Sequence, residues 1–84
     1  MEIKLEKQPQ KYLLKADEAT RKKLYKALEQ IAELRGNIAR LEGFQNRYRY
    51  KLEHYRIIFD WVKGEIVIRV IEINTRSNVR YKRR

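Results

Sequence analysis

The order of apolar and polar residues predicts a chain with helices in its first half and strands in its second. Residues 2–6 alternate apolar and charged side chains, which is the period of a short strand. Pro9 then fits the first turn of a helix, where its missing N–H has no helical partner to lose. The expected buried side of that helix is Tyr12, Leu13 and Leu14.

A second helix is predicted from the residues after Asp17 to about Arg35. Asp17 is a residue type that caps helix N-termini, and Glu18 adds a favourable negative charge in the first turn. Apolar residues then recur at helical spacing on one face: Leu24, Ala27, Leu28, Ile31 and Leu34. Gly36 is the expected C-cap. The two helices are expected to form an antiparallel hairpin that packs on a sheet.

The second half of the chain has the pattern of an antiparallel sheet. Residues 48–52 and 55–61 alternate apolar with mostly charged side chains, and residues 65–73 are apolar on both faces, as in a central strand. Tight turns are expected at Glu53–His54 and Lys63–Gly64. The predicted fold class is therefore α+β, with an N-terminal helical hairpin packed on one face of a small antiparallel sheet of about four strands.

Pairing the strands across these turns assigns each side chain to a face, because side chains alternate with a period of two. The face toward the helices is expected to hold Tyr48, Tyr50, Leu52, Tyr55, Ile57, Phe59, Trp61, Ile66, Ile68 and Val70. The opposite face is expected to hold Arg49, Lys51, Arg56, Asp60 and Arg69, with Ile58, Val67 and Ile71 between them.

The basic residues on that opposite face favour a bound anion. Like charges directly across a strand pair, such as Lys51 and Arg56, are unfavourable for stability, so stability alone would select alternating signs. The alternative is a solvated face in which Asp60 partly neutralises Arg47 and Arg69.

Composition narrows the class of protein. The chain has 84 residues and 21 Lys and Arg against 11 Asp and Glu, a net charge of +10, which fits a single domain over residues 1–84. Such a charge points first to RNA, DNA or an acidic protein as partner, with general solubility as the alternative. The lack of cysteine excludes a disulfide scaffold and a cysteine zinc site, and one histidine excludes a His-rich metal site. The N-terminus has no signal-peptide pattern and no window is apolar enough for a membrane helix, so a cytoplasmic location is expected.

Three segments in order, Leu41–Gly43, Tyr48–Phe59 and Gly64–Ile68, resemble the RelE/ParE superfamily of bacterial toxins, the toxin halves of type II toxin–antitoxin modules. Tyr48–Phe59 is the most specific part, with a basic strand, a short turn and a Tyr-Arg pair that opens the next strand. The resemblance covers nearly the whole chain and implies a RelE-like α+β domain.

The two branches of this superfamily imply different activities. RelE-like members cut mRNA, typically codon by codon in the ribosomal A site, whereas ParE-like members poison DNA gyrase and lack the basic catalytic set. The resemblance also implies a small cognate antitoxin, RelB-like in this branch, as partner, besides the ribosome and its A-site mRNA. Exposed faces of the helical hairpin and open sheet edges are plausible docking surfaces for the antitoxin.

The resemblance implies roles for individual residues. Arg49 and Lys51 match the basic pair before the turn, Arg56 matches the Tyr-Arg arginine, and Arg76 matches the arginine after the last strand. Tyr81 matches a C-terminal tyrosine one residue late, with Arg80 in its place, and Thr75 stands where many relatives have histidine, so the general acid stays open. The catalytic candidates are Lys51, Arg56, Arg76 and Tyr81, and the RNA-binding candidates are Arg49, Arg69, Arg80 and Lys82.

The retained basic residues favour a ribosome-dependent mRNA endoribonuclease. Attack of the RNA's own 2′-OH on the adjacent phosphate would give a 2′,3′-cyclic phosphate, with DNA a poor substrate. Because Asp60 stands alone, the reaction is expected to need neither metal nor cofactor. The planar fork of Arg56 suits the growing phosphoryl charge. Lys51 is a candidate general base, since Arg49 and Arg56 favour its neutral amine, but it can equally stay protonated and hold phosphate.

Two other functions stay open from the sequence. One is a ParE-like gyrase poison on the same fold. The other is a non-catalytic basic module that binds RNA or the ribosome, in which alanine substitutions would weaken binding evenly and abolish no chemical step.

Overall fold

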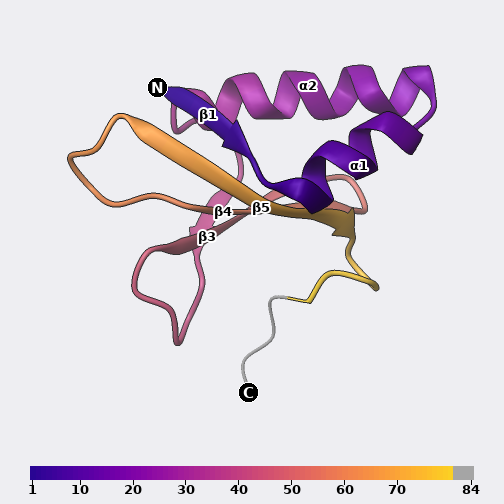
Figure 1. Ribbon diagram of the computed structural model, residues 1–84. Helices are drawn as coiled ribbons and strands as arrows, with labels where there is room; N and C mark the ends of the chain where they lie inside the picture. The colour runs from indigo at the N-terminus through magenta and orange to yellow at the C-terminus, as the bar shows by residue number, and fades with distance from the viewer. Residues whose placement is uncertain (81–84) are drawn as a thin grey trace.

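In the computed structural model, which describes residues 1–80, two helices lie on one face of a five-stranded sheet (Figure 1). The helices are α1 (Lys7–Lys15) and α2 (Glu18–Ala32). The strands are β1 (Glu2–Leu5), β2 (Ile38–Arg40), β3 (Arg47–Leu52), β4 (Tyr55–Asp60) and β5 (Val67–Thr75). Their order across the sheet is β1-β5-β4-β3-β2, with β1 parallel to β5 and every other neighbouring pair antiparallel.

This architecture confirms the predicted α+β class and adds two details to it. The strand β2 was not predicted, because three residues are too few to display an alternating pattern. The edge strand β1 runs parallel to β5. A parallel pair cannot be joined by a tight hairpin, and here both helices and the other three strands lie between β1 and β5 in the chain. Neither described helix is long and apolar enough to cross a membrane.

The helix α1 begins and packs largely as predicted. Pro9 lies in its first turn and is buried, and Leu13 is buried against the sheet. The expectation for Leu14 is wrong, because 78% of this side chain is exposed. Adjacent helix residues point about 100° apart, so only one of two neighbouring leucines can face the core squarely.

Asp17 caps the N-terminus of α2, as predicted. Its carboxylate accepts a hydrogen bond from the backbone N–H of Thr20 at 3.2 Å. This hydrogen bond lowers the pKa of the Asp17 carboxyl below its ordinary value of 3.8, because it favours the charged form. The cap therefore contributes most to stability when the carboxyl is ionised.

Replacing Asp17 by alanine is expected to lower the melting temperature by a few degrees at neutral pH, because an orphan N–H of the helix loses its acceptor. Asp17→Asn should keep most of the stability, since its amide oxygen can accept the same bond. Because the folded pKa is lowered, the ionic part of this stabilisation is present above the ordinary carboxyl pKa and is lost as the pH falls through the folded value. Thermal denaturation followed by circular dichroism tests this, and equal melting temperatures for wild type and Asp17→Ala at neutral pH would contradict it.

The predicted end of the second helix is wrong. The helix ends at Ala32, and Leu34, with φ of 55°, takes the left-handed conformation expected for a glycine cap. The backbone N–H of Arg35 donates to the carbonyl of Gln30 at 2.9 Å, which closes the last turn. Leu34 belongs to the apolar period of the helix and still packs partly against the core, and this packing offsets its strained backbone.

The turn between β3 and β4 is confirmed, since Leu52 lies directly opposite Tyr55. The predicted turn at Lys63–Gly64 is present, since the N–H of Glu65 donates to the carbonyl of Val62 at 2.9 Å. It does not join the two strands directly, however: the connection runs from residue 61 to residue 66, and Asp60 lies opposite Arg69. Ile66, placed in the core by the prediction, is 72% exposed in this loop. The observed pairing of β4 with β5 is shifted by two residues from the predicted one. Because side chains alternate with a period of two, a shift of two leaves the residues of β5 up to Val70 on their predicted faces.

A bulge in the middle of β5 then reverses the faces. Ile58 pairs with Glu72 but its neighbour Phe59 pairs with Val70, so Ile71 is an extra residue in the ladder. Strict alternation would turn Glu72 toward the core and Ile73 away from it. After the bulge Glu72 shares the face of Ile58, and Ile73 is fully buried in the core.

Gln8 supports β5 at the same level. Its side-chain amide donates to the carbonyl of Ile73 at 2.8 Å and accepts from the N–H of Ile73 at 2.9 Å. The pairing of β1 with β5 has already ended at Leu5 and Val70. The Gln8 side chain therefore replaces the missing strand neighbour and satisfies both polar groups of Ile73.

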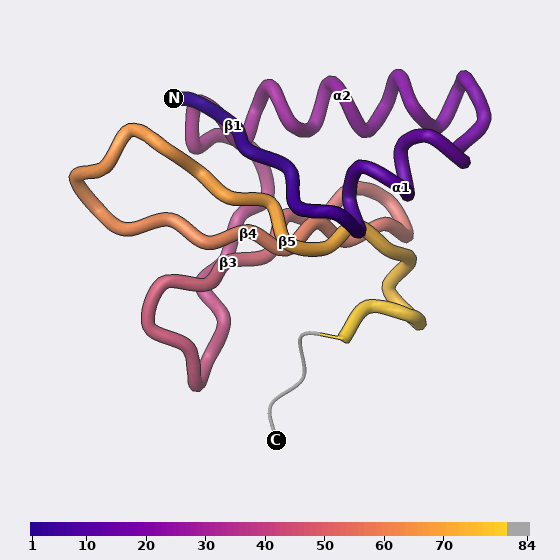
Figure 2. The backbone as a smooth tube through the Cα atoms, in the orientation of Figure 1, coloured from indigo at the N-terminus to yellow at the C-terminus, as the bar shows by residue number. Residues whose placement is uncertain are grey.

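The hydrophobic core lies between the helices and the sheet. Its buried members are Leu13, Leu24, Ala27, Leu28, Ile31, Tyr50, Ile57, Phe59, Ile68, Val70 and Ile73, with Tyr48, Leu52, Tyr55 and Trp61 among the partly buried residues packed against it. Apart from Ile66, this confirms the predicted helix-facing side of the sheet. The other side, which we call the open face, carries no helix in the described part of the chain (Figures 1 and 2).

Candidate functional site

The strand register arranges the side chains of the open face in cross-strand rows. Directly paired residues point to the same face, and neighbours within a row have Cβ atoms roughly 5 Å apart. The first row is Lys4, Arg69, Asp60 and Arg47; the second is Glu72, Ile58, Arg49 and Ala39; the third is Asn74, Arg56 and Lys51. The predicted membership of this face is confirmed for Arg49, Lys51, Arg56, Asp60 and Arg69.

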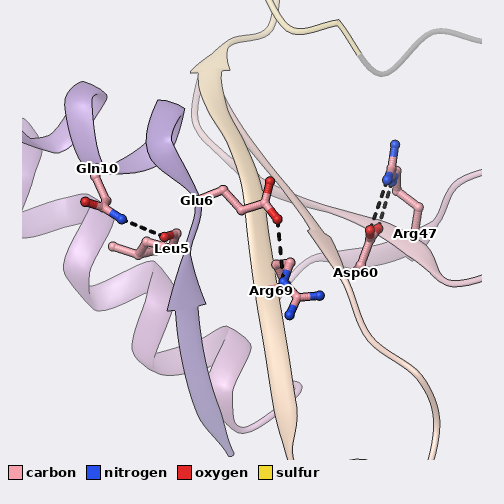
Figure 3. Close-up of polar contacts among 6 residues, drawn as sticks. All are labelled: Leu5, Glu6, Gln10, Arg47, Asp60 and Arg69. Atoms are coloured by element: carbon pink, nitrogen blue, oxygen red, sulfur yellow. Dashed lines mark hydrogen bonds and ion pairs between the residues drawn. The ribbon is translucent and has the colours of Figure 1, made fainter.

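The two arginines of the first row are paired with nearby acids, as Figure 3 shows. Arg47 makes two bonds to the Asp60 carboxylate, from Nε at 2.7 Å and from Nη2 at 2.9 Å. These bonds raise the pKa of the Arg47 guanidinium. The expected neutralisation by Asp60 is thus confirmed for Arg47, whereas Arg69 forms an ion pair with Glu6 instead, with 3.5 Å between Nε and Oε2. Arg69, an RNA-binding candidate, is therefore less available to an anion than predicted.

The third row brings two catalytic candidates together. Lys51 and Arg56 are direct cross-strand partners, and within residues 1–80 no carboxylate lies within ion-pair distance of either. Lys51 is exposed, so its ammonium group is open to a ligand. This pair is a local excess of positive charge that the described protein does not neutralise.

Arg56 is held more tightly than the sequence suggests. Only 7% of the residue is exposed, and its Nη1 donates to the carbonyl oxygens of Glu53 at 3.0 Å and Tyr55 at 2.9 Å. These bonds tie the guanidinium to the β3–β4 turn. Arg56 therefore supplies a fixed positive charge beside Lys51, with one nitrogen of its planar fork already bonded to the protein.

Arg49 lies on the same face of β3 as Lys51, two residues earlier. Its Nη1 donates to the backbone carbonyl of Asn37 at 3.3 Å and to the Asn37 side-chain oxygen at 3.4 Å. Both are neutral acceptors, so the positive charge of Arg49 is kept. Arg49 thus extends the positive region of the open face toward β2.

The chain after β5 brings further basic residues to this region. The backbone N–H of Arg76 donates to the carbonyl of His54 at 2.7 Å, which places Arg76 at the end of the sheet that carries the β3–β4 turn. Arg80 lies beside Glu72, whose two carboxylate oxygens both accept from the Arg80 backbone N–H at 3.2 Å. Both arginines are exposed. The remaining candidates, Tyr81 and Lys82, lie outside the described residues.

Sequence reasoning missed Glu72. The alternating pattern gives no sign of a one-residue bulge, so nothing in it places this acid among the basic residues. The one available signal was an acidic residue inside an otherwise apolar run, since an ionised carboxylate is costly in a core and favours a local change of face.

Two other kinds of site were considered for the described residues, a metal site and a cavity. Among residues 1–80 no three His, Asp or Glu side chains are grouped so that they could hold a metal ion. A cavity of about 400 Å³ lies on the helix side of the sheet, lined in part by Lys11, Tyr12, Lys15 and Tyr55. Burial raises the pKa of the Tyr12 phenol there above its ordinary value of 10.0. The cavity is separated by the sheet from the Lys51–Arg56 pair.

Comparison with known proteins gives one family and one fold. Residues 3–80 match the family model described as ParE toxin of type II toxin–antitoxin system, parDE. A chain of the intact E. coli RelBE toxin–antitoxin complex has a TM-score of 0.73 at 24% identity, with 88% of this chain and 94% of that chain covered. The isolated E. coli RelE toxin has a TM-score of 0.72 at 23% identity, with coverage of 88% and 82%.

An archaeal relative extends the comparison. A chain of the RelE–RelB complex from Pyrococcus horikoshii OT3 has a TM-score of 0.72 at 23% identity, with 93% of this chain and 97% of that chain covered. At these identities the solved structures establish the fold alone. No curated protein sequence matches the chain.

Proposed function

The chain belongs to the RelE/ParE superfamily of toxins from type II toxin–antitoxin systems, and we propose that it is a ribosome-dependent mRNA endoribonuclease that inhibits translation. The observation that carries this proposal is the Lys51–Arg56 pair on the open face. Two like charges directly across a strand pair repel each other, and no described carboxylate relieves them. An RNA phosphate at this position would turn that repulsion into two attractive interactions.

The proposed chemistry uses the substrate's own nucleophile. The 2′-OH loses its proton and attacks the adjacent phosphorus, the bond from phosphorus to the 5′-oxygen breaks, and the leaving 5′-oxygen takes up a proton. The products carry a 2′,3′-cyclic phosphate and a 5′-OH. The fixed charge of Arg56 stabilises the negative charge that grows on the phosphoryl oxygens. Lys51 either accepts the proton of the 2′-OH or holds a phosphate oxygen, and Arg76 assists at the same or the neighbouring phosphate. None of these roles requires a metal or a cofactor.

The RNA path is proposed to continue along the remaining exposed cations. Arg49 keeps its charge beside Lys51, and Arg80 lies at the other side of the second row, beside Glu72. Arg69 contributes less, because Glu6 competes for its guanidinium. Such phosphate contacts give affinity that falls with salt concentration.

A second candidate function is a gyrase poison. The observation in its favour is the match of residues 3–80 to a family described as ParE toxin. The burial of Arg56 also fits a protein that does not use this guanidinium in catalysis. The gyrase-poison function gives no role to the Lys51–Arg56 pair, and we therefore place this function second.

One experiment separates the candidates. The purified chain is incubated with ribosomes stalled on a defined message and, in parallel, with gyrase and supercoiled DNA. We expect cut message with cyclic phosphate ends and intact DNA, and a single 2′-O-methyl nucleotide on the 5′ side of the cut should abolish cleavage there, because it blocks the nucleophile. Gyrase-dependent DNA cleavage with intact message would establish the second function, and ribosome binding without cleavage would leave a non-catalytic module.

A cognate antitoxin, RelB-like, is the proposed protein partner. The solved structures that share the fold include toxin–antitoxin complexes with RelB, by their descriptions. In the described chain β1 pairs only with β5 and β2 only with β3, so both edges of the sheet offer unpaired backbone groups to an added strand. The net charge of +10 favours an acidic antitoxin segment.

A further inference from the structure

We infer that Glu72 is a positioning residue, whose carboxylate holds the C-terminal segment, residues 76–80, against the open face. The effect on cleavage rests on the proposed function, whereas the attachment of the segment is a property of the fold. No sequence pattern assigns this role to Glu72, since only the bulge at Ile71 turns it to the open face.

The carboxylate of Glu72 contacts the backbone of the C-terminal segment and one side chain of its own strand. Both carboxylate oxygens accept from the N–H of Arg80 at 3.2 Å, and Oε2 also lies 3.4 Å from the side-chain amide nitrogen of Asn74. One N–H is thus shared between the two oxygens of a carboxylate, a charge-assisted contact made in two long branches rather than one short bond. Arg80 is therefore attached to β5, eight residues back along the chain.

The segment between these points is shaped to return to the sheet. The carbonyl of Thr75 accepts from the N–H groups of Asn78 at 3.0 Å and Val79 at 2.9 Å, which closes a turn directly after β5. Val79 is only 5% exposed, although it lies beyond the last strand. Figures 1 and 2 both show the chain after β5 turning back on the side of the sheet away from the helices. The segment is thus packed on the open face as well as tied to it.

The choice of a backbone donor has an electrostatic consequence. An acid on a largely basic face would be expected to bond the nearest guanidinium, as Asp60 does with Arg47 and Glu6 with Arg69. Glu72 bonds a peptide N–H instead. Within residues 1–80 the side chains of Arg76 and Arg80 form no ion pair, so both remain available to phosphate while the backbone that carries them is fixed.

The attachment itself is tested without any activity assay. Amide hydrogen exchange of Arg80, followed by NMR, should be slow in the wild type and in Glu72→Gln, whose side-chain oxygen still accepts a hydrogen bond. In Glu72→Ala it should be about tenfold faster or more, which corresponds to loss of a bond worth roughly 1.4 kcal/mol. Glu29→Ala, an exposed α2 residue with the same change in charge, is the matched control and should exchange as the wild type does. Equal Arg80 exchange in all four proteins would overturn the inference.

The functional effect is tested by a double-mutant cycle on cleavage of ribosome-bound message. Glu72→Ala and Arg80→Ala are each expected to lower kcat by about tenfold, and the double variant should be no slower than either, because both remove the same contribution. Glu72→Gln should restore most of the rate. Effects that multiply in the double variant would show that Glu72 does not act through Arg80. If the wild type cuts no message while Glu72→Ala still speeds Arg80 exchange, the proposed function fails and the attachment stands.

Discussion

Replacing Lys51 by alanine is expected to slow cleavage of ribosome-bound message by about 10²- to 10³-fold, which is the usual range for loss of a proton-transfer group or of a charge at the transition state. The chain should stay folded, because Lys51 is exposed and forms no side-chain hydrogen bond or ion pair within residues 1–80. Removing it also removes repulsion of Arg56, so thermal stability should be unchanged or slightly higher. Single-turnover kinetics on a stalled ribosome complex measures the effect.

The control for this experiment is Lys63→Ala, which makes the same change in net charge in the exposed β4–β5 loop and should cleave at the wild-type rate. Lys51→Arg distinguishes the two proposed roles, because arginine keeps the charge but does not lose a proton near neutral pH. Recovery of most of the rate would assign Lys51 to phosphate binding, and no recovery would assign it to proton transfer. A folded Lys51→Ala protein with wild-type activity would remove the residue from the site.

Substitution of Arg56 is harder to interpret than substitution of Lys51, although the sequence predicted both residues as catalytic candidates. Its truncation would leave the carbonyl oxygens of Glu53 and Tyr55 without their guanidinium donor and open a space under the β3–β4 turn. Lost activity in Arg56→Ala would therefore combine lost chemistry with a disturbed turn. Kinetic comparison is meaningful only beside a measured melting temperature for the same variant.

Gly36→Ala is expected to destabilise the fold by about 3 kcal/mol or more, whereas Gly64→Ala should cost only about 1–2 kcal/mol. Both glycines have left-handed backbones, with φ of 95° and 96°, so both variants share the conformational cost. A Cβ at Gly36 would lie 2.6 Å from Cε2 of the Tyr50 ring and 2.7 Å from Oε1 of Gln30, whereas a Cβ at Gly64 would meet nothing within 4 Å. The difference between the two variants isolates the contacts with Tyr50 and Gln30.

Thermal and chemical denaturation measure this difference. For a domain of this size about 1 kcal/mol corresponds to roughly 4–8 °C in melting temperature, so Gly36→Ala should melt well below Gly64→Ala. Tyr50 is buried and its hydroxyl bonds to Gln30 at 3.3 Å, so the ring has little freedom to move aside. Equal melting temperatures would mean that the start of β2 shifts easily, and that the close packing of Gly36 on Tyr50 contributes little.

Several features of this protein could be predicted because they depend on neighbours along the chain. The Asp17 cap needs only Thr20, three residues away. The β3–β4 hairpin needs only its turn, and from it follows the pairing of Lys51 with Arg56 on one face. The resemblance to the toxin superfamily was likewise carried by three short segments, most specifically by Tyr48–Phe59 around this hairpin, and the family match confirms it.

The features that prediction missed depend on contacts between distant segments. Leu34 ends α2 in a strained conformation because the core holds its side chain, which no local propensity reveals. The loop between β4 and β5 was longer than the glycine at residue 64 suggested, since Asp60 and Arg69 set the pairing. The amide of Gln8, 65 residues from Ile73, satisfies the backbone beside the bulge.

The sequence by itself determined the two faces of the sheet and the charge of one of them, because side-chain alternation along a strand is a property of the extended backbone. The tertiary structure alone decided which of these charges are free to meet an anion. In the folded chain Arg56 is hydrogen-bonded to the β3–β4 turn and Arg69 forms an ion pair with Glu6. Glu72 lies on the open face, where its carboxylate accepts a hydrogen bond from the backbone of Arg80. The physical reason is that ion pairs, burial and a one-residue bulge arise from segments brought together by the fold, and an alternating pattern carries no information about them.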